Sequence, residues 1–96
     1  MPVSNYTRRH IAIALRSNAA ADDMATVIDA GSGTLTLHTK RHLATAMLSD
    51  NVSGIAFDIA ALIDSGNALV GDQESRLGLA LGSRAAAAEI NTLISA

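Results

Sequence analysis

Apolar residues recur every three or four positions in several short stretches of the chain, which is the spacing of one face of an α-helix. The alternation of every second residue that is typical of a half-buried strand is absent from these stretches. We therefore predict six short helices whose apolar faces are Ile11/Ala14/Leu15, Met24/Val27/Ile28, Leu43/Ala46/Met47, Ile59/Leu62/Ile63, Leu77/Ala80/Leu81 and Ile90/Leu93/Ile94.

These stretches belong to an internal repeat of about 32 to 35 residues. Thr7–Asn18 matches Thr39–Asp50 and, after a three-residue insertion, Asp23–Gly31 matches Asp58–Gly66. A third copy lies 66 residues after the first and matches it over Leu77–Ser83 and Ala85–Ile94. Each copy contains two helical stretches, so we predict a single all-α domain, residues 1–96, made of three tandem helical hairpins at residues 5–30, 39–65 and 72–95.

Small polar residues and glycines mark the predicted turns. A serine hydroxyl between the two helices of each copy can accept a bond from the first free amides of the second helix, and the candidates are Ser17, Ser49 with Ser53 as its rival, and Ser83. Gly31 and Gly66 are expected to end second helices as left-handed caps. The linkers contain short apolar segments, 34–37 and 68–70, that either pair as strands or lie across the helices; we favour the second arrangement.

The charges at the helix ends oppose the helix dipole, since basic residues open the first helices and acids close the second ones. In an antiparallel hairpin these two ends lie side by side. We therefore predict structural ion pairs of Asp29 with Arg8 or Arg9, and of Asp64 with Lys40 or Arg41.

Two further features point towards contacts with a partner. An acid precedes the apolar face of each second helix, at Asp23, Asp58 and Glu89. This acidic row is either solvated or paired within the chain, or it faces basic groups of a partner. The last helix has few large polar side chains, so Leu93 and Ile94 are candidate interface residues together with the acidic row.

The composition and the motifs argue against most kinds of metal, nucleic-acid and catalytic site. The chain has no Cys, a formal net charge of −2 and 2% aromatic residues, which argues against thiolate metal sites and against an overall positive field for nucleic acid. His38 and His42 lie four residues apart without an indicated third metal ligand, so a surface or capping role is favoured over zinc. Val27–Thr34 resembles the phosphate-binding turn of actin-like ATPases, but a helix cap explains it better. We expect no enzyme activity, cofactor or metal.

An alanine-rich domain of this length buries little apolar area per residue and lies near the stability margin, which favours oligomerisation or docking. The segments Leu79–Ile90 and Leu43–Asp50 resemble short helical elements of accessory virion proteins of tailed bacteriophages, such as head-decoration and fibre-associated components. This resemblance implies a non-enzymatic structural subunit, commonly a homo-oligomer, that docks on a capsid or tail.

The leading hypothesis is therefore a structural or assembly protein of a phage virion. Two alternatives stay open: a small DNA-binding regulator that uses the third hairpin as a helix-turn-helix, where only Arg84 and Asn91 are available to read DNA, and a monomeric adaptor that binds a protein. The first ten residues lack the apolar core of a signal peptide and the apolar runs are too short to span a bilayer. We expect a cytoplasmic product, found in the virion if the phage hypothesis holds.

Overall fold

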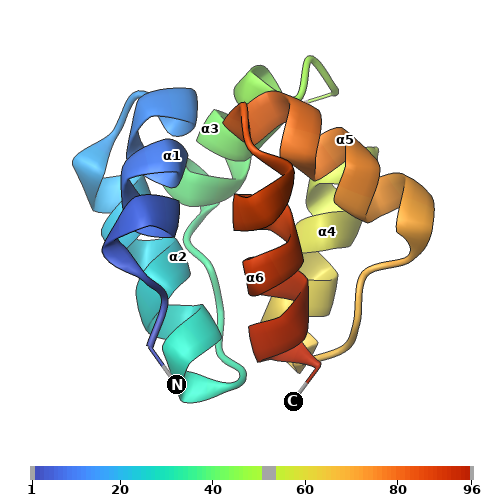
Figure 1. The fold of residues 1–96 in the computed structure, drawn as a ribbon. Helices are drawn as coiled ribbons and strands as arrows, with labels where there is room; N and C mark the ends of the chain where they lie inside the picture. The colour runs from blue at the N-terminus through green and yellow to red at the C-terminus, as the bar shows by residue number, and fades with distance from the viewer. Residues whose placement is uncertain (1, 51–53, 96) are drawn as a thin grey trace.

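Six helices and no strand make up the part of the chain that the structure describes. The structure is a computed structural model and describes residues 2–50 and 54–95. Its helices are α1 (Asn5–Leu15), α2 (Asn18–Ala30), α3 (Leu37–Ala46), α4 (Ile55–Ser65), α5 (Gly71–Leu81) and α6 (Arg84–Ile94). Consecutive helices pack as hairpin 1 (α1 and α2), hairpin 2 (α3 and α4) and hairpin 3 (α5 and α6) (Figure 1). The predicted all-α fold is confirmed.

Serine caps begin two helices and left-handed glycines end two helices where the repeat predicts them. The hydroxyls of Ser17 and Ser83 each accept a hydrogen bond of 3.0 Å from a backbone N–H in the first turn of α2 and α6. Gly31 and Gly66 end α2 and α4 with φ values of 87° and 71°, a conformation that suits a residue without a Cβ. The predicted roles of these four residues are confirmed.

The turn of hairpin 2 departs from the other two. Helix α4 begins at Ile55, and its N-cap residue is Gly54, which offers no side-chain bond. The cap predicted at Ser49 is therefore wrong, because the three-residue insertion moves the start of α4 away from that hydroxyl. Ser49 Oγ is buried and has no hydrogen-bond partner among the residues described. The rival cap, Ser53, lies outside the described residues.

Helix α3 also begins earlier than the repeat predicts, at Leu37 instead of Thr39. Thr36 explains this start, since its hydroxyl accepts a 3.2 Å bond from the backbone N–H of Thr39. The helix therefore includes two residues that the sequence assigned to the linker.

The segments before the first helix of each hairpin lie as extended straps over the core. Their apolar residues Val3, Leu35 and Leu69 are 6%, 2% and 6% exposed. A polar side chain on the second helix of the same hairpin binds each of their backbone N–H groups: Asp29 at 2.7 Å, Asp64 at 2.8 Å and Asn91 at 2.8 Å, respectively. The linkers thus lie across the helices, as favoured from the sequence, and they form no strand within the described residues.

Hairpin 1 lies between the other two and packs against both. Helix α1 contacts α3, α5 and α6, and helix α2 contacts α3, α4 and α6, whereas the contacts between hairpins 2 and 3 are much weaker. Equivalent positions of the three hairpins meet in the core, including the fully buried Ile11, Leu43 and Leu77 of the first helices. None of the helices described is long and apolar enough to cross a membrane.

Candidate protein-docking site

The surface of hairpin 2 that meets hairpin 1 is built around two histidines. His42 Nδ1 lies 2.7 Å from the backbone oxygen of Leu15, and since a carbonyl oxygen only accepts, this nitrogen carries the donated proton. His38 Nε2 lies 3.3 Å from Ser17 Oγ, and the two imidazole rings are 4.3 Å apart. His42 thus binds the carbonyl at the end of α1, and His38 binds the serine that caps α2. We call this set of contacts a joint.

The same joint recurs between hairpins 1 and 3. His10 Nδ1 lies 2.8 Å from the backbone oxygen of Leu81, and Tyr6 Oη lies 2.8 Å from Ser83 Oγ. The ring centroids of Tyr6 and His10 are 4.5 Å apart. These histidines hold hairpins together, and no group of three or more His, Cys, Asp or Glu within the described residues could hold a metal ion.

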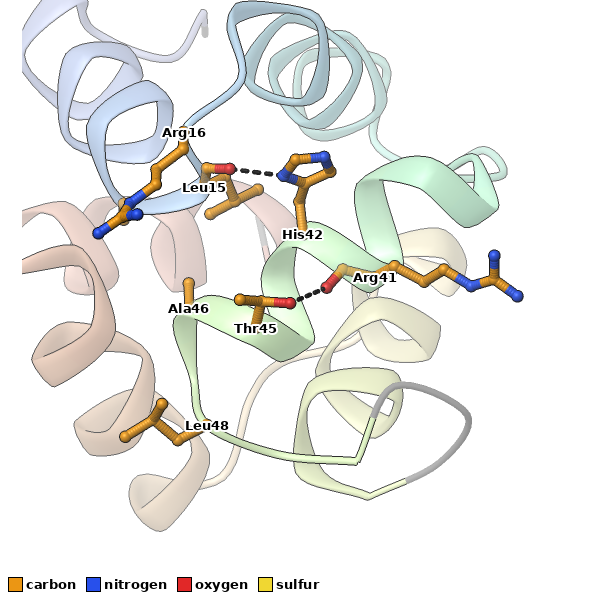
Figure 2. A pocket seen from close by; sticks show the side chains of 8 residues that line it. Leu15, Arg16, Arg41, His42, Thr45, Ala46 and Leu48 are labelled. Carbon is orange, nitrogen blue, oxygen red and sulfur yellow. Dashed lines mark hydrogen bonds between the residues drawn. The ribbon is translucent and has the colours of Figure 1, made fainter.

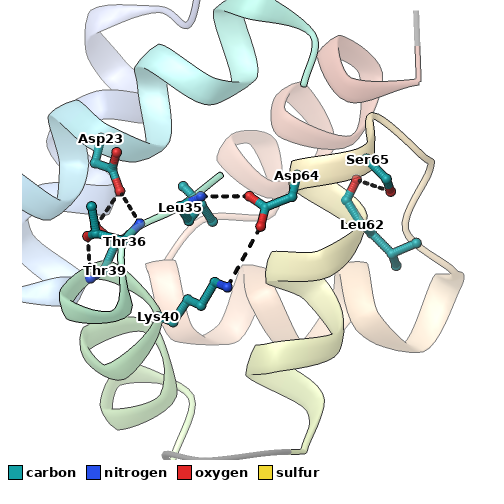
Figure 3. Close-up of polar contacts among 8 residues, drawn as sticks. All are labelled: Asp23, Leu35, Thr36, Thr39, Lys40, Leu62, Asp64 and Ser65. Atoms are coloured by element: carbon teal, nitrogen blue, oxygen red, sulfur yellow. Dashed lines mark hydrogen bonds and ion pairs between the residues drawn. The ribbon is translucent and has the colours of Figure 1, made fainter. Parts of the chain in front are cut away.

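Two of the three acids predicted as interface residues bind inside the chain. Asp23 Oδ2 accepts bonds from the Thr36 backbone N–H at 3.0 Å and from the Thr39 hydroxyl at 2.8 Å, which ties α2 to the start of α3 (Figure 3). Glu89 Oε2 accepts the backbone N–H of Ser4 at 2.8 Å, which ties α6 to the start of α1.

The third acid of the row, Asp58, is exposed in the first turn of α4. Asp23 and Glu89 are therefore paired within the chain, which is one of the two interpretations that the sequence left open. Their carboxylates are used because the amides at the start of a helix have no acceptor within the helix itself.

Burial of the Glu89 carboxylate would raise its pKa, but hydrogen bonds from the Ser4 backbone, the Ser4 side chain and the Thr7 side chain outweigh that effect. The pKa of Glu89 therefore lies below its ordinary value of 4.5. The carboxylate of Glu89, and not its neutral acid, is therefore the form that accepts the bonds from Ser4 and Thr7.

The predicted ion pairs divide between the hairpins. Lys40 Nζ lies 3.8 Å from Asp64 Oδ2, so this pair is brought together (Figure 3). Asp29 does not pair with Arg8 or Arg9 in the structure described. Its Oδ1 accepts the Val3 backbone N–H instead, and Arg8 pairs with Asp22 of α2.

The remaining predicted basic residues, Arg9 and Arg41, are exposed. The interface predicted at the last helix is also not available at Ile94, which is 2% exposed because it packs in the core. Leu93 is half-buried against the same core. The last helix thus packs its apolar face into the hydrophobic core of the chain.

A hollow of about 580 Å³ lies where α1 and α3 end side by side. Alanines and Leu15 line much of it, and the guanidinium groups of Arg16 and Arg41 extend in opposite directions (Figure 2). The lining residues are Ala14, Leu15, Arg16, Arg41, His42, Thr45, Ala46 and Leu48.

A second hollow of about 280 Å³ lies next to the first, between hairpins 2 and 3, and Ala46 and Leu48 line both. Its other lining residues are Met47, Arg76, Leu79 and Ala80. We call the two hollows together the docking groove. Every described residue that lines it is apolar, a threonine or basic, and none is acidic.

Leu48 is the unusual residue of the docking groove. Its side chain is 92% exposed, and its backbone has the left-handed φ of 54°, which is unfavourable for a leucine. Equivalent positions of the other hairpins have the same conformation but carry residues suited to water or to that backbone, Arg16 with φ 54° and Gly82 with φ 68°. Leu79, which lines the second hollow, is 83% exposed.

The pattern of apolar residues along the chain does not indicate this groove. Helix periodicity detects residues that face the core, and Leu48 and Leu79 face solvent. A signal was available in the repeat itself, where Leu48 takes the place of Arg16 and Gly82 at a helix end. A leucine at a helix end where the other two copies have no apolar side chain is the signal that could have identified the site.

Comparisons of the chain with protein-family models, with curated proteins and with solved structures gave no match.

Proposed function

We propose that the chain is a non-enzymatic assembly protein that docks on another protein through the docking groove. The observation that carries this proposal is Leu48, which combines a left-handed backbone with an almost fully exposed apolar side chain. The left-handed backbone costs a leucine about 1–2 kcal/mol, and exposing the side chain forgoes the stabilisation of burying it. The left-handed backbone serves the fold, because it ends α3 with the same backbone bonds that end α1 at Arg16 and α5 at Gly82. The exposed leucine side chain has no such role in the isolated chain, whereas it is useful if a partner covers it.

The composition of the groove favours a protein partner over a small polar substrate. A substrate site needs a few polar groups that converge on one point. Here His42 Nδ1 is already bound to the Leu15 carbonyl, and Arg16 and Arg41 extend apart (Figure 2). What the groove offers instead is apolar surface flanked by charge, which is the arrangement of a protein interface.

The direct test is the size of the complex that the chain forms in the cells that produce it. Tagged protein at its natural level should migrate on a density gradient with a larger assembly, and Leu48→Asn should release it to the 9.8 kDa monomer. Asparagine tolerates a left-handed backbone, so this variant removes the apolar side chain without straining the fold. Wild-type chain that migrates as a free monomer, or a variant that stays in the assembly, would reject the proposal.

The narrower form of this proposal is a virion subunit of a tailed bacteriophage that forms a homo-oligomer or decorates the particle. It rests on the resemblance of Leu79–Ile90 and Leu43–Asp50 to helical elements of such proteins. Light scattering during size-exclusion chromatography would show whether the chain is oligomeric over a range of concentrations. Mass spectrometry of purified particles would then show whether the chain is present at a fixed copy number.

A further inference from the structure

We infer that the occupant of the docking groove is an acidic amphipathic helix of a partner protein, with aliphatic side chains on one face and carboxylates beside them. This inference rests on the proposed function and specifies the chemistry of its partner. Three features of the groove lead to it: its shape and lining, its charge, and the lack of any other backbone or aromatic recognition element.

The lining of the groove fits bulky aliphatic side chains. Ala14, Ala46 and Ala80 are small and leave space. Leu48, which lines both hollows, and Leu79, which lines the second, stand out into solvent beside it. Side chains of a partner can enter this space and cover both leucines. The hollows follow one another along the surface from the end of α1 to α5, so the partner must present apolar groups along a line rather than at one point.

The backbone and composition of the groove favour a helix as that line of apolar groups. Recognition by strand addition needs an exposed sheet edge, and the described residues contain no strand. Recognition of a proline-rich segment needs an aromatic groove, and none of the described lining residues is Phe, Tyr or Trp. A helix that lays its apolar face into a groove requires only aliphatic surface, which this groove provides.

The charges select carboxylates on the partner and disfavour a second copy docked face to face. Arg16, Arg41 and Arg76 flank the groove, and none of its described lining residues is acidic. In a symmetric dimer through this surface, each arginine would meet the same positive surface of the other copy. Glutamates or aspartates beside the apolar face of a partner helix would instead be attracted to these guanidinium groups.

The test uses a fluorescently labelled synthetic peptide of about 20 residues, long enough to form a helix, with leucines along one face and glutamates on either side of them. Fluorescence anisotropy should show saturable binding to the full chain that weakens as salt is added. Two comparison peptides separate shape from charge: one with the same composition in scrambled order and one with lysines in place of glutamates. Both should bind at least about tenfold more weakly.

Variants of the chain locate the binding surface. Leu48→Asn and Leu79→Gln should each weaken binding by about tenfold. Ile13→Gln is the matched control, because Ile13 occupies the same repeat position as Leu79 and is 76% exposed, but it does not line the groove. The double variant Arg41→Glu, Arg76→Glu should reverse the preference and bind the lysine peptide better than the glutamate peptide.

Four outcomes would overturn the inference: no saturable binding of the glutamate peptide, equal binding of the scrambled peptide, equal loss with Ile13→Gln, or dimerisation of the chain that Leu48→Asn abolishes. The gradient experiment distinguishes this failure from failure of the proposed function. If the peptide fails but Leu48→Asn still releases the chain from its native assembly, docking through the groove holds and the partner has another chemistry. If neither experiment shows an effect of Leu48→Asn, both proposals fail.

Discussion

The joints that hairpin 1 makes with its two neighbours differ sharply from the contact between hairpins 2 and 3. In each joint a ring binds a capping serine, a histidine binds the carbonyl at a helix end, and a carboxylate binds the start of a helix. At the equivalent positions of hairpin 3, the sequence has Asp72 for the ring, Arg76 for the histidine and Val70 for the capping hydroxyl. The corresponding serine, Ser49, has no partner among the described residues.

This difference shows how a repeated fold can leave one of its internal contacts open. The helical framework of all three hairpins is alike, because each buries the same apolar positions. The weaker contact between hairpins 2 and 3 coincides with a three-residue insertion and with the substitutions at Val70, Asp72 and Arg76. The docking groove extends into that contact, and Arg76, which replaces a joint histidine, lies along it.

The largest effect on stability is expected at Gly66, where hairpin 2 approaches the backbone of hairpin 1. A Cβ at Gly66 would lie 2.3 Å from the Gly31 backbone oxygen, and Gly66 also has a positive φ of 71°. We expect Gly66→Ala to lower the free energy of unfolding by at least about 2 kcal/mol in denaturant titrations. Gly31→Ala is the control for backbone strain alone, since its Cβ would meet nothing within 4 Å, and it should cost about 1 kcal/mol. Equal losses would show that the close approach of hairpins 1 and 2 is not as described.

The next prediction compares Asp23, whose carboxylate ties α2 to the start of α3, with Asp58, the equivalent residue of hairpin 2, which is exposed. Asp23→Ala leaves the Thr36 N–H and the buried Thr39 hydroxyl without their acceptor, so it should cost about 1–3 kcal/mol of stability. Asp58→Ala removes an exposed side chain and should change stability by no more than about 0.5 kcal/mol. Thermal and chemical unfolding of both variants would measure the difference. If Asp58→Ala proves as harmful as Asp23→Ala, hairpins 2 and 3 are joined more firmly than the structure shows.

A smaller effect follows from the pKa of Glu89, which is lowered in the fold. A lowered pKa means that the carboxylate stabilises the fold above its ordinary pKa of 4.5, and that this contribution is lost as the pH falls through the lower folded value. At neutral pH, Glu89→Gln should cost about 1 kcal/mol, the difference between a charged and a neutral acceptor. The gap between wild type and variant should narrow as the pH is lowered. Asp72→Asn, which removes an exposed charge of the same sign, is the control, and a gap that stays constant with pH would contradict the assignment.

The smallest effect on stability is expected in the docking groove. Leu48→Asn should leave the free energy of unfolding within about 0.5 kcal/mol of wild type, because the leucine is exposed and asparagine tolerates its backbone. Leu43→Ala, one turn earlier and fully buried, should cost about 2–5 kcal/mol. The two unfolding curves, measured together, would show whether Leu48 contributes to stability as Leu43 does. A large loss with Leu48→Asn would mean that this side chain supports the fold.

The sequence predicted the helices because their apolar faces follow a regular period and their ends carry familiar caps such as Ser17 and Gly31. It did not predict which acid meets which partner, because that depends on how hairpins pack. The Asp29 pair was assigned from the geometry of one hairpin, whereas the Val3 strap supplies a backbone donor to the same carboxylate. The docking groove was missed for the same reason, since one hollow forms where α1 and α3 end side by side and the other forms between hairpins 2 and 3.

The bond between the Ser4 backbone and Glu89 also has a consequence for how the chain is made. These residues are 85 positions apart, and Tyr6 and His10 likewise find their partners 77 and 71 positions later. A ribosome adds about 5–20 residues per second, so α1 emerges seconds before its acceptors exist. During that time hairpins 1 and 2 can form their own joint, but the joint between hairpins 1 and 3 cannot close. Helix α1, which is synthesised before the other five described helices, thus closes its contacts with hairpin 3 only after all of them have been made.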